Sequence, residues 1–208
     1  MKPYSPVHII SENSKCGCSI NLPIRGHCRP TKNCAACCYA KSGYTRLPAS
    51  MRKQIYVSRY LASKDISRLK EECRAKSAVR ISGTGDLLMS HVKNLVQLAK
   101  DLPMVQFWGM TRKLEIANAV NKKVPNLRIL LSVDGTSPSR VWNYQGPMCW
   151  GPRIATDQVK DDPRIKTVFP YHFVGRVVKG MPRHAKDCKA VWHEISGCLS
   201  CGRCWSWS

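Results

Sequence analysis

Leu127-Arg-Ile-Leu-Leu-Ser-Val133 is the clearest strand pattern in the chain, because its residues are almost all apolar. Such a run suits a strand that is buried on both faces of a parallel sheet. Two shorter apolar runs precede it, at 78–81 and 104–108, and helical patterns at 87–100 and 112–122 separate the three. Strand and helix alternate in units of about 25 residues, which predicts βα repeats and a parallel sheet.

The pattern continues on both sides of these repeats. A helical pattern begins at Ser50, a good N-cap residue, and continues to about Lys76. Arg153–Ala155 and Lys166–Phe169 are candidates for two further short strands. A complete βα barrel needs about 250 residues, and this chain has 208. The fold class predicted is therefore α/β, with an incomplete parallel βα barrel-like sheet.

The chain length suits a single domain with a sizeable core. We expect one α/β domain over residues 1–208, with a cysteine-rich N-terminal loop at 28–40, a βα core at about 50–170 and a cysteine-rich C-terminal tail at 188–204. In parallel α/β folds, ligands bind at the carboxyl ends of the strands. Small or polar residues follow three of the predicted strands, at 82–86, 109–112 and 134–137. The first cysteine loop can lie over that same edge.

The compartment decides how the twelve cysteines are interpreted. No apolar run reaches the ~18 residues that cross a bilayer, and residues 1–14 lack the apolar region of a signal peptide. We therefore expect a cytoplasmic protein that does not enter a membrane. In a reducing compartment, clustered cysteines are more often metal ligands than disulfides.

The first cysteine set is a loop with the spacing Cys28-x5-Cys34-x3-Cys38. Iron–sulfur clusters are held by thiolates that short loops bring together, so these three cysteines are candidate ligands of a 4Fe–4S cluster. Cys37 is the alternative to Cys38 as the third ligand. Adjacent side chains tend to point apart, so we expect one of the two, and not both, to bind the same cluster. Three thiolates leave one iron open to a substrate, a cofactor or another ligand. Asp86 is a candidate for that ligand, but a turn-forming or N-capping role is the preferred interpretation of this residue.

The second set closes the chain, with the spacing Cys188-x9-Cys198-x2-Cys201-x2-Cys204. The compact C-x2-C-x2-C run resembles ferredoxin-type loops, which hold iron–sulfur clusters. Zinc is the alternative, because four-thiolate zinc sites also use C-x2-C pairs. The spacing leaves open whether the two sets form one centre or two.

Four cysteines fall outside these ligand sets. Cys73 lies in a predicted helix and Cys149 stands next to a tryptophan, so both are interpreted as small buried residues. Cys16 and Cys18 lie in a predicted loop and have no assigned role beyond that of spare ligands.

The charge of the chain suggests its partners. Lys and Arg number 34 against 13 Asp and Glu, which gives a formal net charge of +21. Such a field attracts nucleic acid, nucleotides or an acidic host protein. A merely soluble basic protein is the plainer alternative.

Several blocks together resemble the phage "gene product 88" family. They are Asn21-Leu-Pro23, the cysteines 28, 34 and 38 with Tyr39-Ala40, Ser82-Gly-Thr-Gly-Asp86, Phe107-Trp-Gly-Met-Thr-Arg112 and the last three cysteines with Trp205. The order matches over residues 14–205. The resemblance implies a bacteriophage or prophage source and a location in the host bacterial cytoplasm.

The same segments are similar, more distantly, to the radical S-adenosylmethionine enzymes. That resemblance implies a cluster on Cys28, Cys34 and Cys38, and S-adenosylmethionine near Gly83, Gly85 and Asp86. The loop of those enzymes is C-x3-C-x2-C, which differs from the spacing here.

Three hypotheses follow. In the first, the protein is an enzyme that cleaves S-adenosylmethionine at an open iron. In the second, it is a non-catalytic basic protein with a structural iron–sulfur or zinc site, and it binds nucleic acid or a host transcription protein. In the third, it is an electron carrier.

Overall fold

The sheet is the central element of this computed structural model. The structure describes residues 5–6, 8–13, 17–41, 43–121, 123–154, 158–170, 172–173, 176–177, 184–188, 201 and 204. Seven strands form one sheet in the order β1 to β7, namely β1 (Ser11–Asn13), β2 (Gly17–Ile20), β3 (Ala78–Ile81), β4 (Gln106–Thr111), β5 (Leu127–Val133), β6 (Met148–Arg153) and β7 (Ile165–Pro170). A separate antiparallel pair joins β8 (His172–Phe173) and β9 (Arg176–Val177).

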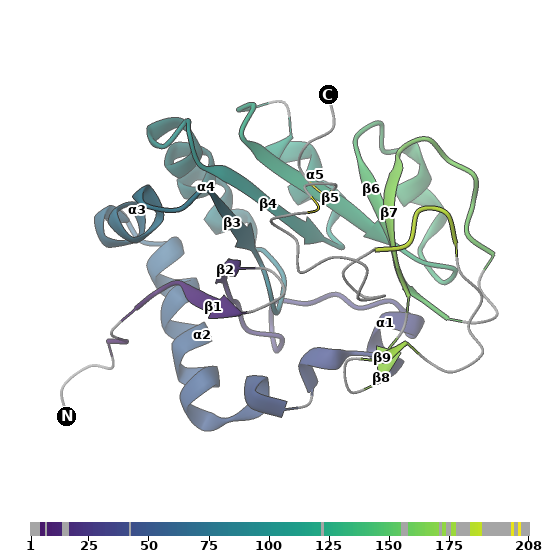
Figure 1. The fold of residues 1–208 in the computed structure, drawn as a ribbon, viewed down its shortest axis with the longest axis horizontal. Coiled ribbons are helices and arrows are strands. Elements are labelled where there is room, and N and C mark those ends of the chain that lie inside the picture. The colour runs from purple at the N-terminus through teal and green to yellow at the C-terminus, as the bar shows by residue number, and fades with distance from the viewer. Residues whose placement is uncertain are drawn as a thin grey trace.

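The strands follow one another across the sheet in chain order (Figure 1). β1 pairs antiparallel with β2, and every later neighbour is parallel. Right-handed crossovers that always step in the same direction place all their helices on the same face of a sheet. The α/β class and the parallel barrel-like sheet predicted from the sequence are confirmed, and the sheet is open.

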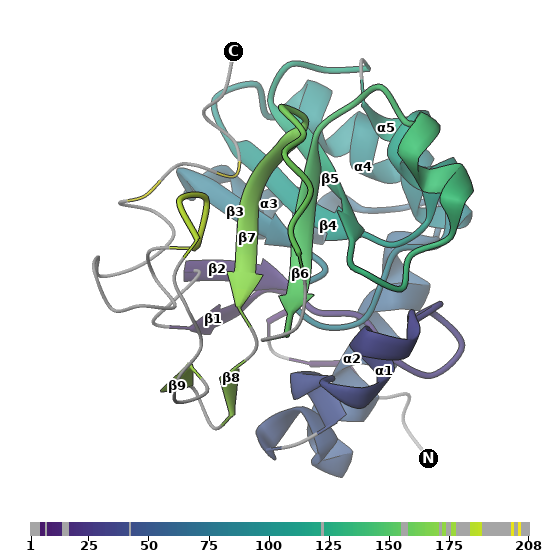
Figure 2. The same cartoon turned by 90° about the vertical axis from the view of Figure 1, so that its right-hand side faces the viewer.

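The helices occupy that one face. They are α2 (Pro48–Leu61), α3 (Ser67–Arg74), α4 (Met89–Asp101) and α5 (Leu114–Val120). Short 3-10 segments join the elements, namely η1 (Tyr39–Lys41), η2 (Gly43–Arg46) and η3 (Ser139–Asn143). In Figure 2, α4 and α5 lie on one side of the sheet, and the described parts of the C-terminal segment lie on the other.

The residues of β4 and β5 show how the two faces differ. Phe107 and Ile129 belong to the large apolar core shared with the helices. Trp108 and Leu130, one position along each strand, point to the opposite face, where Cys149 and Cys204 pack against them. This alternation follows from the two-residue period of a strand.

Three sequence-based expectations about helices are wrong. The helix expected from Ser50 to Lys76 is two helices, because a turn with hydrogen bonds from the Ser63 hydroxyl separates them. The first of the two begins at Pro48, since proline is well suited to the first helical position. The loop expected at 28–40 contains a short helix, α1 (Lys32–Ala36).

Two sequence-based expectations about strands also differ from the structure. The sixth strand covers Met148–Arg153, earlier than the expected 153–155. Gly17–Ile20, where a loop was expected, is a strand that pairs with β3 and carries Cys18. Cys16 and the segment around Cys198 lie outside the described residues.

Candidate metal centre at the carboxyl edge of the sheet

The first cysteine loop is fixed to the carboxyl edge of the sheet by hydrogen bonds. The Thr31 hydroxyl accepts from the backbone N–H of Cys34 at 3.2 Å, which caps α1, and donates to the carboxylate of Asp134 just after β5. The backbone N–H of Asn33 donates to the hydroxyl of Thr136 at 3.2 Å. α1 also contacts β6 at this edge (Figure 2).

The far end of the loop is held to the end of β3. The Tyr39 hydroxyl donates to the carbonyl oxygen of Gly83 at 2.6 Å. The loop that carries Cys28, Cys34 and Cys38 is therefore tied to the ends of two strands. This is the edge at which parallel α/β proteins bind ligands.

The three predicted ligands lie within range of one another's charge. Burial is the largest cause that raises the pKa of the Cys28 thiol to about 12, and the charges of Asp86, Cys38 and Cys34 contribute to the same shift. Burial also raises the pKa of the Cys34 thiol, and the Cys38 thiolate adds to that effect. The charge of Cys38 acts on both of the other thiols, and the choice of Cys38 over Cys37 as the ligand stays a prediction.

Two buried cations face these thiols. The charge of Arg112 and its hydrogen bond to Cys34 lower the pKa of that thiol, and the ammonium of Lys113 lowers the pKa of Cys28. Lys113 is held by a hydrogen bond of 2.5 Å from its Nζ to the carbonyl oxygen of Leu87. Positive neighbours favour the thiolate form, which is the form that binds metal. Sequence reasoning missed both cations as site residues, although it had noted the polar strand end at 109–112.

Arg112 also pairs with the buried carboxylate of Asp134. Its Nη1 lies 3.0 Å from Asp134 Oδ2, and the pair is held by charge rather than by a well-aligned hydrogen bond. A second nitrogen of the guanidinium donates to the carbonyl oxygen of Gly151 on β6. Arg112 therefore joins the ends of β4, β5 and β6 beneath the cysteine loop.

Asp86 organises the same edge. It is 4% exposed, and burial raises its pKa. Its carboxylate accepts from the Thr111 hydroxyl and the Leu87 N–H, each at 2.7 Å, and from the Arg112 N–H at 3.2 Å. These bonds give Asp86 the turn-forming role that the sequence analysis had weighed against metal ligation. Contact with a cofactor stays a prediction.

The two glycines of this strand end allow close approach of another segment. Gly85 has a φ of +70°, and a Cβ there would come within 2.3 Å of the Leu22 carbonyl oxygen. A Cβ at Gly83 would come within 2.4 Å of the Asn21 side chain. The backbone packing therefore requires Gly85, whereas Gly83 faces the side chain of Asn21. The predicted contact of both glycines with S-adenosylmethionine stays a prediction.

A hydrogen-bonded pair of histidines adjoins the loop and was missed in the sequence. The Leu88 N–H donates to Nδ1 of His91, so Nε2 of this ring carries the proton in the neutral form. That N–H donates to the Ser58 hydroxyl at 3.2 Å, and the hydroxyl donates to Nε2 of His27 at 2.7 Å. His27 precedes Cys28 directly. No sequence signal joins these residues, because the pairing depends on how α2 packs on α4.

The other cysteines fall into separate places. Ten cysteines lie in the described residues, and none of these ten forms a disulfide bond. Cys73 is buried in the core beneath the helices, as predicted. The described members of the second predicted set lie on the face of the sheet away from the helices. Within the described ranges, no three His, Cys, Asp or Glu side chains stand close enough together to hold a single ion as they lie.

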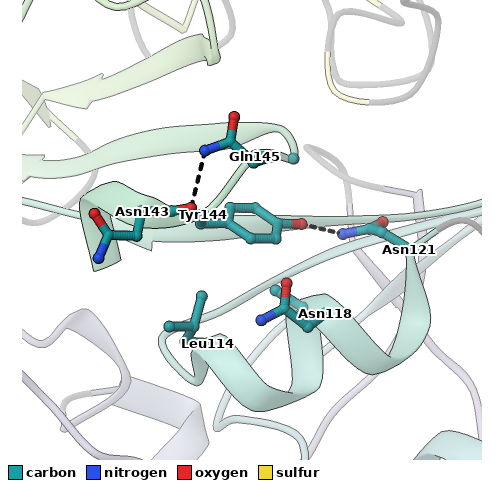
Figure 3. A pocket seen from close by; sticks show the side chains of 8 residues that line it. Leu114, Asn118, Asn121, Asn143, Tyr144 and Gln145 are labelled. Atoms are coloured by element: carbon teal, nitrogen blue, oxygen red, sulfur yellow. Dashed lines mark hydrogen bonds between the residues drawn. The ribbon is translucent and has the colours of Figure 1, made fainter. Parts of the chain in front are cut away.

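A separate hollow of about 350 Å³ lies along α5 (Figure 3). Tyr144 and Asn121 are hydrogen bonded across it at 2.5 Å. No cysteine and no charged side chain is among the residues that line it. The candidate site is therefore the cysteine edge and not this hollow.

Fold and site together define a cysteine-rich α/β protein with an open, mostly parallel sheet. A family model described as Gene product 88 matches residues 8–206. The chain belongs to this family, which confirms the resemblance drawn from its sequence blocks. No curated protein and no solved structure matches the chain significantly. The similarity to radical S-adenosylmethionine enzymes gains no support from these comparisons. No helix among the described residues has the length and apolar character to cross a membrane.

Proposed function

We propose that this protein binds a 4Fe–4S cluster at the carboxyl edge of its sheet through Cys28, Cys34 and Cys38. The observation that supports the proposal is that one loop carries the three cysteines, and that hydrogen bonds tie this loop to the carboxyl ends of β5 and β3. Thiolates are the ligands of such clusters. A cluster of several irons also spaces its thiolates more widely than a single ion does. This agrees with described thiols that affect one another's pKa but do not stand close enough together to bind a single ion.

The cluster would have one iron without a cysteine ligand. An exchangeable ligand could bind there, and S-adenosylmethionine is our proposal for it, on the strength of the sequence resemblance. Asp86 acts electrostatically on Cys28, so the strand end predicted to receive the cofactor adjoins the proposed cluster. A reduced cluster of this kind supplies one electron to its ligand. The role of the chain would be to hold the cluster in a cationic setting that favours its thiolate ligands.

The test is the iron and sulfide content of protein purified without oxygen. Cys38→Ser should lower the content by about four irons and four sulfides per chain, and the matched variant Cys37→Ser should leave it unchanged. Equal iron in the two variants would contradict the proposal. Addition of S-adenosylmethionine to the reduced protein should shift its electron paramagnetic resonance signal. An unshifted signal would remove the cofactor from the proposal and leave the cluster.

A second candidate function is nucleic-acid binding, with the cluster as a structural element. The formal charge of +21 favours it. So does the segment around η2, where Tyr44 is 85% exposed beside the exposed Lys41 and Arg46. Cations that track a backbone and exposed aromatic rings are what single-stranded nucleic acid binds.

This candidate predicts affinity for a single-stranded oligonucleotide that falls steeply with salt. Replacing Arg46 by Gln should weaken binding and reduce the salt dependence. Replacing Tyr44 by Ala should weaken binding without changing the salt dependence of binding. Binding that neither variant changes would argue against this surface.

A further inference from the structure

A second group of cysteines lies on the face of the sheet away from the helices. Cys149 of β6 and Cys204 of the C-terminal segment belong to one buried cluster with Trp108 and Leu130. Cys149 is fully buried and Cys204 is 9% exposed. The two thiols are 55 positions apart in the sequence, and Cys149 belongs to neither of its cysteine sets.

Cys188 reaches the same face through strand register. Cys149 lies opposite Thr167 of β7, and Asp187 lies opposite Val168. The backbone N–H of Cys188 donates to the carbonyl oxygen of Val168 at 2.8 Å. Since successive residues of a strand alternate between faces, Cys188 falls on the face of Thr167 and therefore on the face of Cys149.

Electrostatics joins these three thiols to a fourth. Burial raises the pKa of the Cys204 thiol most, and the charges of Cys149, Cys188 and Cys201 raise it further. Arg80 has the opposite effect, because its guanidinium lowers the pKa of both Cys204 and Cys149. Cys201 stands three positions before Cys204, so the segment that places Cys204 in the buried cluster also brings Cys201 close to it.

The sheet supplies more positive charge beneath these thiols. Arg80, Trp108 and Arg128 lie opposite one another across β3, β4 and β5, on the face where Cys204 packs. The guanidinium of Arg80 lies 5.3 Å from the centre of the Trp108 ring. Buried charge is costly unless it is compensated. Arginines in the floor of a group of thiols are the compensation that an anionic thiolate–metal centre needs.

Cys73 shows what a purely structural cysteine looks like in this chain. It is as fully buried as Cys149, but it packs in the core beneath the helices. Burial is the largest cause that raises the pKa of its thiol, followed by the charges of Glu72 and Cys18. Cys149 differs because three other cysteines of the described residues gather at its face of the sheet.

We infer that Cys149 is a ligand of a second metal centre, which it forms with Cys188, Cys201 and Cys204. The centre is an iron–sulfur cluster, because several irons reach thiolates that, as the described residues lie, stand too far apart to share a single ion. The sequence-based ligand set had Cys198 in place of Cys149. The inference does not depend on the cluster proposed at the first loop, because the two groups use different cysteines.

The test removes the first site before it counts metal. A variant with Cys28, Cys34 and Cys38 replaced by Ala leaves the second centre as the cysteine site that remains. Iron, sulfide and zinc are measured in it after purification without oxygen. We expect about four irons with sulfide per chain, and zinc without iron overturns the inference. A variant that holds neither metal overturns the inference.

Two single changes in that background identify the fourth ligand. Cys149→Ala should lower the metal content at least fourfold, and the matched buried variant Cys73→Ala should retain it. Cys149→Ser, which preserves the volume of the side chain more closely, should lower the metal content in the same way if Cys149→Ala does not fold. Metal retained in either Cys149 variant overturns the inference. So does a disulfide between Cys149 and Cys204 in protein kept without oxygen, detected by mass spectrometry.

Discussion

Replacing Arg112 by Gln should be among the most destabilising single changes at the carboxyl edge. The Arg112 side chain is 10% exposed, and the Asp134 side chain beside it is fully buried. Without the guanidinium, the hydrogen bonds that the Asp134 carboxylate keeps within the described part of the chain come from Thr31 and Thr136. Removing one partner of a buried ion pair costs about 3–5 kcal/mol. Because those hydrogen bonds remain, we expect about 3 kcal/mol.

The assay is urea unfolding followed by tryptophan fluorescence, on Arg112→Gln, Asp134→Asn and the double variant. The double variant removes the stranded charge along with its partner, so it should cost less than the sum of the two single changes by about 1–3 kcal/mol. Arg29→Gln is the control, since Arg29 pairs with Glu115 at the surface and should cost less than about 1 kcal/mol. A loss below about 1 kcal/mol for Arg112→Gln, or strict additivity in the cycle, would refute the reasoning.

Two further predictions concern Gly85 and His91. Gly85→Ala combines a φ of +70° with a clash against the Leu22 carbonyl, whereas Gly26→Ala has a similar φ of +76° and open space around it. In thermal unfolding, Gly26→Ala should lower the free energy of unfolding by about 1 kcal/mol, and Gly85→Ala should lower it clearly more. Equal losses would show that the close approach to Leu22 is not important. Burial lowers the pKa of His91 to about 4 from an ordinary value of 6.5, so the unfolded chain binds the proton more tightly and stability should fall as the pH drops from about 6.5 to 4, by up to about 3 kcal/mol. His91→Asn should flatten that part of the urea-unfolding profile, and parallel profiles for the two proteins would contradict the assignment.

Much of the parallel sheet could be predicted because its central strands carry their own signal. β3 and β5 cover the predicted residues 78–81 and 127–133, since strands buried on both faces must be apolar along their whole length. β2 could not be found in this way. It has only four residues, and its partner β3 lies about sixty positions further on, so local pattern contains nothing that marks it.

In the candidate site, too, local sequence predicts some features and misses those that depend on distant segments. Spacing alone selected Cys28, Cys34 and Cys38, because ligands on one short loop are necessarily near in sequence. The cations that face them come from the end of another strand, and Cys149 approaches Cys204 only because β6 lies beneath the C-terminal segment. From the sequence alone, Cys149 was therefore interpreted as a small buried residue. Its burial confirms this interpretation, and its contact with Cys204 suggests a further role as a ligand.

The sequence by itself determined the α/β class, the order of the βα repeats, the family and the two cysteine sets, because each of these depends on residues that are close together in the chain. Only the tertiary structure decided which thiols share a face, which cations neutralise them and which carboxylates are buried beside them. Those relations depend on strand register and on packing between distant segments, and sequence spacing carries no record of either.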